Sequence, residues 1–211
     1  YIRFVFITGI SKFSRVGIFS SLNNLEDLTF NPHFATLVGL TEGEIKHELA
    51  PYISNLAISE GITEAVLVEK MHQWYNGFCF VHNCESVYNP FSVLNLFAQQ
   101  RFANYWFESG TPTFLIKLLK EHNYDLHPIE KIELTEQSFS TDDITYLEIV
   151  PLLFQTGYLT LKGCDPDSQR YQLGHPNNEV RDSFLTHLLT TFNTTIAKVS
   201  KQRSSLAIER S

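Results

Sequence analysis

The spacing of apolar residues along the chain changes from strand-like to helix-like within the first fifty residues. Phe4–Ile7 is apolar at every position, which is typical of a strand buried between the layers of a parallel sheet. A parallel sheet needs further strands, and no later series of strand–helix–strand units follows in the sequence. We therefore expect the partner strands to be encoded upstream of Tyr1, and the N-terminus to be that of a cut domain.

The next part of the chain has helical patterns with clear boundaries. Thr41 and Glu44 have the spacing of a capping box, so we predict a helix over 42–52. A second helix is predicted to end at Asn76-Gly77, where glycine can adopt a left-handed cap. Its apolar face is expected to consist of Ala65, Val66, Val68, Met71 and Trp74.

A short hairpin-like segment with the turn VHNCES precedes a third predicted helix. Asn89 is well placed as its N-cap and Pro90 as its first residue, where a missing amide costs nothing. The residues expected to face a core are Val93, Leu94, Leu96 and Phe97. A further helix is predicted after 110–112, with Phe114, Leu115, Leu118 and Leu119 on its apolar face.

The last third predicts a helix that ends at Gly157, a β-hairpin across the turn CDPDS, and a closing helix capped by Asn177 or Asn178. Helices followed by a hairpin and a closing helix are the outline of a winged helix. The tail 193–211 lacks a sustained apolar face and is predicted to be disordered. The predicted fold class is mainly α with minor β (α+β).

Composition narrows the function classes. The net charge of −7 argues against a surface built for polyanions, although a local basic patch stays open. Three irregularly spaced cysteines indicate a reducing compartment rather than a disulfide scaffold, and no apolar run is long enough to span a bilayer. We expect a cytoplasmic protein without a membrane anchor.

Some residues suggest chemistry but have simpler structural interpretations. Cys79, His82 and Cys84 lack the fourth ligand and the paired spacing of a zinc site, so we expect no metal. His175 could face a nucleotide, but a turn histidine explains it better. The stretch WYNGF could stack on a base, although a packed helix end explains these aromatic residues as well.

Six stretches, in order, carry a resemblance to a known family: FVFITGISKFSRVGIFSSLNNLEDLT, WYNGF, VYNPFSVLNLF, YWFESGTPTFLIKLL, LLFQTGYLTL and YQLGHPNNEVRDSF. They resemble the AAA-ATPase-like family of bacterial proteins. That family typically has a P-loop ATPase domain, a helical lid and a winged-helix-like region, often followed by a PD-(D/E)XK nuclease-like domain. The resemblance extends to about Leu189.

The resemblance implies that this chain is the C-terminal part of the ATPase region. It implies a remnant of the ATPase core with a sensor strand over 1–40, a helical lid over 41–85 and a winged-helix-like region over 86–192. The sequence contains no G-x-x-x-x-G-K-[ST] motif, so the amides that cradle phosphates are missing. ATP and Mg²⁺ are therefore expected only in the full-length context, and we expect no catalysis by this chain alone.

Within the first motif, Thr8 stands where a polar sensor residue would meet the γ-phosphate or the attacking water. Lys12 and Arg15 could neutralise charge on the transferred phosphoryl group. Thr8 could equally cap the strand, and the two cations could form a solvated basic turn. The three residues are the candidate catalytic set, with Thr8 and Lys12 as the candidate nucleotide contacts.

Two functions from different classes follow. The chain is either the sensor, lid and winged-helix portion of an ATPase, or a stand-alone protein- or nucleic-acid-interaction module of winged-helix type. The expected partners are the missing P-loop half and a nuclease-like domain, while homo-oligomer formation stays open. Arg181, Glu179 and Asp182 give the predicted last helix mixed charge, which argues against tight DNA binding.

Overall fold

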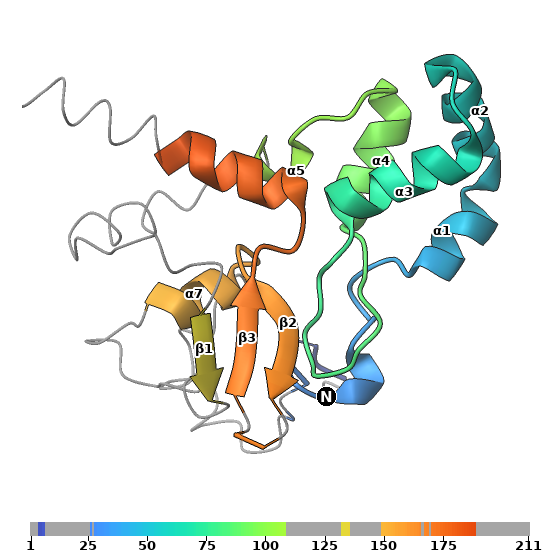
Figure 1. Ribbon diagram of the computed structural model, residues 1–211. Coiled ribbons are helices and arrows are strands. Elements are labelled where there is room, and N and C mark those ends of the chain that lie inside the picture. Colours follow the sequence, from blue (N-terminus) through green and yellow to red (C-terminus); the bar gives the residue numbers. More distant parts are fainter. Residues whose placement is uncertain are drawn as a thin grey trace, which may run out of the picture.

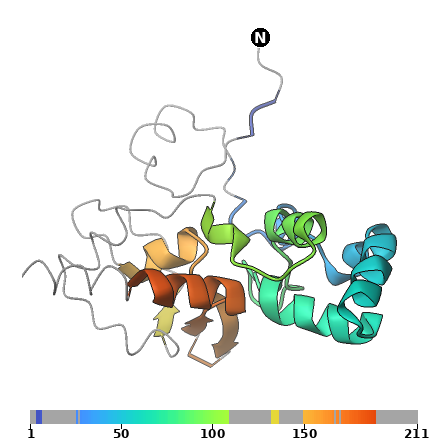
Figure 2. The ribbon, with the colours of Figure 1, turned by 90° about the horizontal axis from the view of Figure 1, so that it is seen from above.

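The computed structural model describes residues 4–6, 26, 28–108, 132–135, 149–165, 167–168 and 170–188. In these residues, the fold consists of short helices and one small antiparallel sheet of three strands (Figure 1). The predicted class, mainly α with minor β, is confirmed. The helices α1–α4 lie together on one side of the molecule and the sheet lies on the other (Figures 1 and 2).

The first helical stretch follows a short 3-10 helix, η2 (Pro32–Phe34), and starts as predicted. Thr41 and Glu44 form the capping box at the start of α1 (Glu42–Glu48). The predicted single helix over 42–52 is wrong, because the helix is interrupted at Leu49 and a second helix, α2 (Ala50–Glu60), follows. Pro51 explains the break: it has no amide to donate to the preceding turn, and its ring would clash with a carbonyl there.

The helix α3 (Glu64–Tyr75) ends where the sequence predicted, before Asn76 and Gly77. Its buried face agrees with the prediction only in part: Met71 is buried, Val68 and Trp74 are partly buried, and Ala65 is exposed. The buried residues are Leu67, Met71 and Tyr75, whereas Val66 is 53% exposed. Leu67, Met71 and Tyr75 follow one another at intervals of four residues, so they lie along one face of the helix.

Helix α4 (Pro90–Gln99) is capped by the side chain of Asn89, as expected. It buries one face but exposes Leu94 at 56%, so the prediction that Leu94 faces a core is wrong. The short helix α5 (Tyr105–Glu108) follows and contacts α4. Together α1–α5 enclose a first hydrophobic cluster, the helical cluster, which includes Ile45, Leu56, Leu67, Met71, Tyr75, Tyr88 and Leu96.

The predicted hairpin is confirmed. Helix α7 (Ile149–Gln155) ends before Gly157, which is left-handed with φ 81, and β2 (Thr160–Asp165) pairs antiparallel with β3 (Arg170–Gly174). The sequence analysis missed the third strand, β1 (Ile132–Thr135), which pairs with β3 and gives the order β1-β3-β2. A helix over 178–188, coloured red in Figure 1, follows β3.

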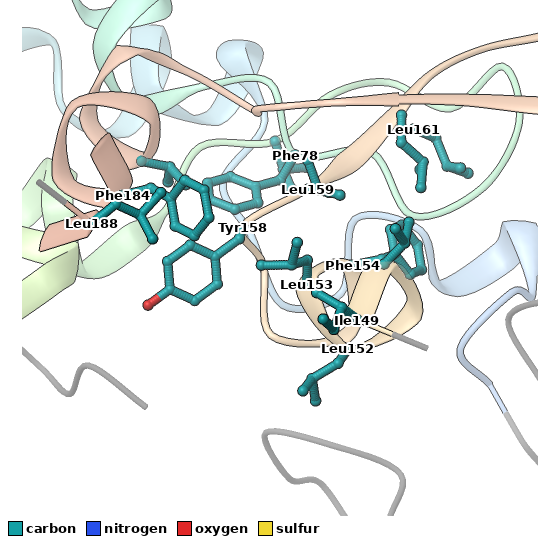
Figure 3. Packing of buried hydrophobic residues seen from close by; sticks show 14 residues of the cluster. Phe78, Ile149, Leu152, Leu153, Phe154, Tyr158, Leu159, Leu161, Phe184 and Leu188 are labelled. Atoms are coloured by element: carbon teal, nitrogen blue, oxygen red, sulfur yellow. The ribbon is translucent and has the colours of Figure 1, made fainter. Parts of the chain in front are cut away.

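A second hydrophobic cluster, the sheet cluster, lies between α7, the hairpin and the helix over 178–188. Figure 3 shows its centre, where the Tyr158 ring meets Phe184 with 5.2 Å between ring centroids. Phe78 and Val87 join this cluster from the loop that follows α3. The two clusters are therefore connected by the chain between 76 and 89.

One sequence interpretation is corrected in the loop between α3 and α4. Cys79 and Cys84 are joined by a disulfide, whereas the spacing of the cysteines indicated a chain without a disulfide scaffold. Phe4, Val5 and Phe6 are exposed and belong to no strand of the described residues, so their expected burial beside strands encoded upstream stays a prediction. In the described ranges, no helix has both the length and the apolar character needed to cross a membrane.

Gly77 should be the most demanding glycine to replace. It has φ 96, and a Cβ atom there would lie 2.1 Å from the carbonyl oxygen of Pro176. We expect Gly77→Ala to lower the free energy of unfolding by about 3 kcal/mol or more, because backbone strain and a backbone clash add together. Urea denaturation followed by circular dichroism measures the loss.

Gly61→Ala is the matched control. Gly61 is also left-handed, with φ 68, but nothing lies within 4 Å of a Cβ atom there. We expect a loss of about 1 kcal/mol, which is the cost of the left-handed backbone alone. Equal losses in the two variants would contradict the assignment of the Pro176 contact as the dominant constraint.

Candidate functional site

The candidate catalytic set from the sequence lies outside the described residues. Thr8, Lys12 and Arg15 all fall in this category, so their roles stay predictions. The structure instead draws attention to a group of buried polar contacts where the helical cluster meets the sheet cluster. We call this group the polar junction and define it by Asn76, Ser92, Trp106, Asn177 and Glu179.

Glu179 is the centre of the polar junction. Its side chain is completely buried at the start of the helix over 178–188. The Ser92 hydroxyl of α4 donates a hydrogen bond to Glu179 Oε2 at 2.8 Å and lies 3.0 Å from Oε1. The backbone N–H of Trp106 in α5 donates to Oε1 at 2.8 Å. One carboxylate therefore ties three helices together.

Burial raises the pKa of Glu179 to about 7, although the hydrogen bonds from Trp106 and Ser92 act in the opposite direction. Removing a carboxylate from water disfavours its charged form, and donors to the carboxylate favour it. The negative charge also acts on Tyr75 of α3, whose pKa is raised chiefly by its own burial. The carboxyl group of Glu179 is thus able to change protonation state close to neutral pH.

A second set of contacts lies beside Glu179. Asn177 caps the helix by accepting a hydrogen bond from the Val180 N–H at 3.0 Å, which confirms one of the two predicted caps. Its amide group also donates to the carbonyl oxygen of Asn76 at 2.7 Å. Lys162 of β2 donates to the carbonyl oxygen of Pro176 at 3.1 Å. The loop before the helix is therefore held to both α3 and the hairpin.

The aromatic residues of WYNGF are packed rather than open for stacking. Tyr75 is fully buried, and its ring lies parallel to Phe102 with 5.8 Å between centroids. The Tyr75 hydroxyl donates to the carbonyl oxygen of Ala103 and accepts from its N–H, both at 3.0 Å. The structure therefore supports the packed helix end for Tyr75 rather than a platform for a base.

His175 is also placed by structural contacts. Its Nδ1 atom lies 2.9 Å from the carbonyl oxygen of Tyr158, and its ring packs on Phe184 at 5.5 Å. These contacts fit the interpretation as a turn histidine. As for metals, the described part of the chain contains no cluster of three or more His, Cys, Asp or Glu side chains suited to holding an ion.

A cavity of about 410 Å³ lies between α1, α2 and α3, away from the polar junction. Its lining includes the charged residues Glu42, Glu64, Glu69 and Lys46 together with apolar residues such as Ile53 and Val68. The Lys46 side chain pairs with Glu42 and lowers the pKa of that carboxyl group. Because Ser54 also donates a hydrogen bond to Glu64 at 2.5 Å, these acidic groups are partly satisfied within the protein itself.

The sequence analysis did not recognise Glu179 as a site residue and treated it only as a surface charge. A signal was present in the helical spacing. Glu179 and Ser183 are four residues apart and adjoin Val180 and Phe184, so they belong to the buried stripe of the helix. A carboxylate within an apolar stripe requires hydrogen-bond donors from the protein. Here the donors, Ser92 and Trp106, are more than seventy residues away in the sequence, so the sequence pattern alone does not identify them.

Comparison with known proteins identifies one similar protein from Azotobacter chroococcum mcd 1, described as "Uncharacterized protein in vnfD 5'region". It is 36% identical over 211 residues, which cover 98% of this chain, and the chain spans 38% of the length of that relative. No protein-family model and no solved structure matches the chain. That description names no activity.

The raised pKa of Glu179 predicts a specific pH dependence of stability. The folded protein keeps a proton on Glu179 up to about pH 7, whereas the unfolded chain loses it near the ordinary value of 4.5. The stabilisation is thus full below about pH 4.5 and is lost as the pH rises to 7. The expected loss from this group is about 3 kcal/mol.

Glu179→Gln should remove this component, because an amide does not titrate and can still accept the Trp106 N–H and donate to Ser92. The measurement is the free energy of unfolding between pH 4 and pH 8, compared with wild type. Glu85→Gln, at an exposed carboxylate, is the control and should keep the wild-type slope. If Glu179→Gln also kept the full wild-type slope, burial of a titrating Glu179 would be contradicted.

Proposed function

We propose that this chain is the sensor-strand, lid and winged-helix-like portion of an AAA-ATPase-like protein. In this proposal it couples ATP binding or hydrolysis in a P-loop half to a partner domain, in the cytoplasm. The chain alone does not hydrolyse ATP, because its sequence contains no motif able to cradle the phosphates.

One observation carries the proposal: four of the six stretches that carry the family resemblance contribute residues to the polar junction. Asn76 comes from WYNGF, Ser92 from VYNPFSVLNLF, Trp106 from YWFESGTPTFLIKLL, and Asn177 and Glu179 from YQLGHPNNEVRDSF. Residues of these four stretches bond to one another across the two clusters. Such a joint suits a part that transmits movement.

The physical basis is rigid-body coupling. A nucleotide changes the position of a neighbouring domain only if the connecting elements move together. The Trp106 ring packs edge-on against Tyr158 at 4.8 Å, which adds an apolar contact to the polar junction between α5 and the sheet cluster. A displacement of the helical cluster would therefore carry the sheet and the helix over 178–188 with it.

In this proposal, three residues of the chain contact the nucleotide. Thr8 would position the attacking water or respond to the γ-phosphate, and Lys12 and Arg15 would neutralise phosphoryl charge. ATP supplies the phosphoryl group and Mg²⁺ accompanies it. The remaining phosphate contacts would come from the P-loop half, which has no counterpart in this sequence.

A stand-alone interaction module is the second candidate function. The hairpin β2–β3 followed by the helix over 178–188 favours it, since this order also occurs in nucleic-acid-binding winged helices. Arg181 is exposed on that helix, but Asp182 is exposed next to it. This mixed charge makes the ATPase portion the better supported function.

Calorimetry with ATP and Mg²⁺ tests the proposal on two proteins. One is the 211-residue chain, and the other is a longer polypeptide that includes a P-loop half encoded upstream in the same frame. We expect binding only by the longer protein. There, Thr8→Ala and Lys12→Ala should each lower the hydrolysis rate by about tenfold or more while the fold is kept.

His82→Ala, at an exposed position far from the proposed nucleotide contacts in sequence, is the control and should leave hydrolysis unchanged. Tight ATP binding by the short chain would overturn the account of a divided site. Stable folding of the short chain together with submicromolar binding to DNA would instead support the stand-alone module.

A further inference from the structure

The loop between α3 and α4 is the chain segment that contacts both hydrophobic clusters. Phe78 and Val87 form an antiparallel bridge and pack in the sheet cluster. The adjacent Tyr88 packs in the helical cluster and forms a second bridge with Leu40. The conformation of this loop therefore influences how the two clusters are connected.

The loop also extends the edge of the hairpin. The Cys79 N–H donates a hydrogen bond to Thr160 Oγ1 at 2.7 Å, and this hydroxyl donates back to the Cys79 carbonyl oxygen at 2.9 Å. The same carbonyl oxygen accepts the N–H of Leu161 at 3.2 Å. Cys79 is thus the attachment point between the loop and strand β2.

Cys79 is bonded to Cys84 at the turn of this loop, with 6.1 Å between their Cα atoms. That separation lies within the range that disulfides adopt. Both residues are partly exposed, so a small thiol in solution can reach them. Because only four residues separate the two cysteines, the bond constrains the loop itself much more than the whole chain.

The same loop offers a stable arrangement to the reduced form. Cys79 Sγ lies 3.0 Å from the carbonyl oxygen of Val81, so a Cys79 thiol has a hydrogen-bond acceptor within its own loop. Asn83 provides the left-handed residue of the turn, with φ 57, a conformation that asparagine adopts more readily than most residues. Neither form requires the loop to leave the hairpin edge completely.

We propose that Cys79 and Cys84 form a reversible redox site that sets the rigidity of the joint between the two clusters. In reduction, an external thiolate attacks one Sγ atom, the Sγ–Sγ bond breaks, and a mixed disulfide forms. A second external thiolate attacks the external sulfur of this mixed disulfide and releases the protein sulfur. Both protein thiolates take up a proton, and the external thiols leave as a disulfide.

The reverse reaction uses a low-molecular-weight disulfide as oxidant and restores the Cys79–Cys84 bond. This site reconciles the paired sulfurs with a reducing compartment, since partly exposed disulfides are the readily reduced ones. In both forms, the hydrogen bonds to Thr160 and Leu161 attach Cys79 to β2. In the oxidised form, the short ring also restricts the loop to the conformation that makes these bonds, and reduction removes this restriction.

A redox titration of the 211-residue chain tests this proposal. The protein is equilibrated in glutathione buffers of graded reduced-to-oxidised ratio, quenched with an alkylating reagent and analysed by peptide mass spectrometry. We expect a single reversible transition at the Cys79–Cys84 peptide. Hydrogen exchange on the same samples should show the amides of Leu161 and Phe78 exchanging about tenfold faster after reduction.

Variants separate this effect from general destabilisation. Cys79→Ser and Cys84→Ser should each exchange at Leu161 like the reduced protein in every buffer. Cys164→Ser, at the unpaired cysteine of β2, should keep the wild-type transition. A pair that stays reduced in fully oxidised glutathione overturns the proposal, and so does a pair that titrates without changing exchange at Leu161 and Phe78.

Discussion

The buried carboxylate of Glu179 and its donors from α4 and α5 form the interaction on which the arrangement of the rest depends. The Ser92 hydroxyl, 2.8 Å from Oε2 and 3.0 Å from Oε1, and the Trp106 N–H both donate to this side chain. A buried charge or carboxyl group left without partners costs several kcal/mol, far more than an exposed ion pair contributes. The helical cluster can therefore take few positions against the sheet cluster without leaving Glu179 unsatisfied.

Close packing beside Glu179 also restricts how the helical cluster and the sheet cluster lie against each other. Gly77 leaves room for the Pro176 carbonyl group, and Asn177 uses one side chain to cap its helix and bond to α3. Apolar packing alone would tolerate sliding, because hydrophobic contacts are not directional. The hydrogen bonds are directional, so they favour one relative position of the two clusters. Residues that are distant in the sequence are therefore held in one arrangement by both shape and hydrogen-bond direction.

Local features of the fold were predictable from the sequence because they depend on neighbouring residues. The caps at Thr41 and Asn89 and the hairpin after Gly157 follow from side-chain hydrogen bonding and backbone preference. The helix predicted through Pro51 was wrong although a local rule forbade it. The apolar residues continue past the capping box at helical spacing, which favours one helix, but Pro51 interrupts it.

Features that depend on distant partners could not be predicted in the same way. The buried faces of α3 and α4 differ from expectation at Val66 and Leu94, since several apolar stripes compete on each helix and tertiary packing selects one. Strand β1 is only four residues long and is defined by its pairing with β3. The structural role of Glu179 likewise depends on hydrogen bonds from Ser92 and Trp106, which are remote in the sequence.

Native-state hydrogen exchange at increasing denaturant tests most directly whether the polar junction makes the two clusters one unit. The probes are Leu67 and Leu96 in the helical cluster, and Leu161 and Phe184 in the sheet cluster. Our account predicts that their exchange free energies converge on one line before global unfolding, and that Ser92→Ala separates them into two groups. Two separate groups already present in the wild-type protein would contradict the account.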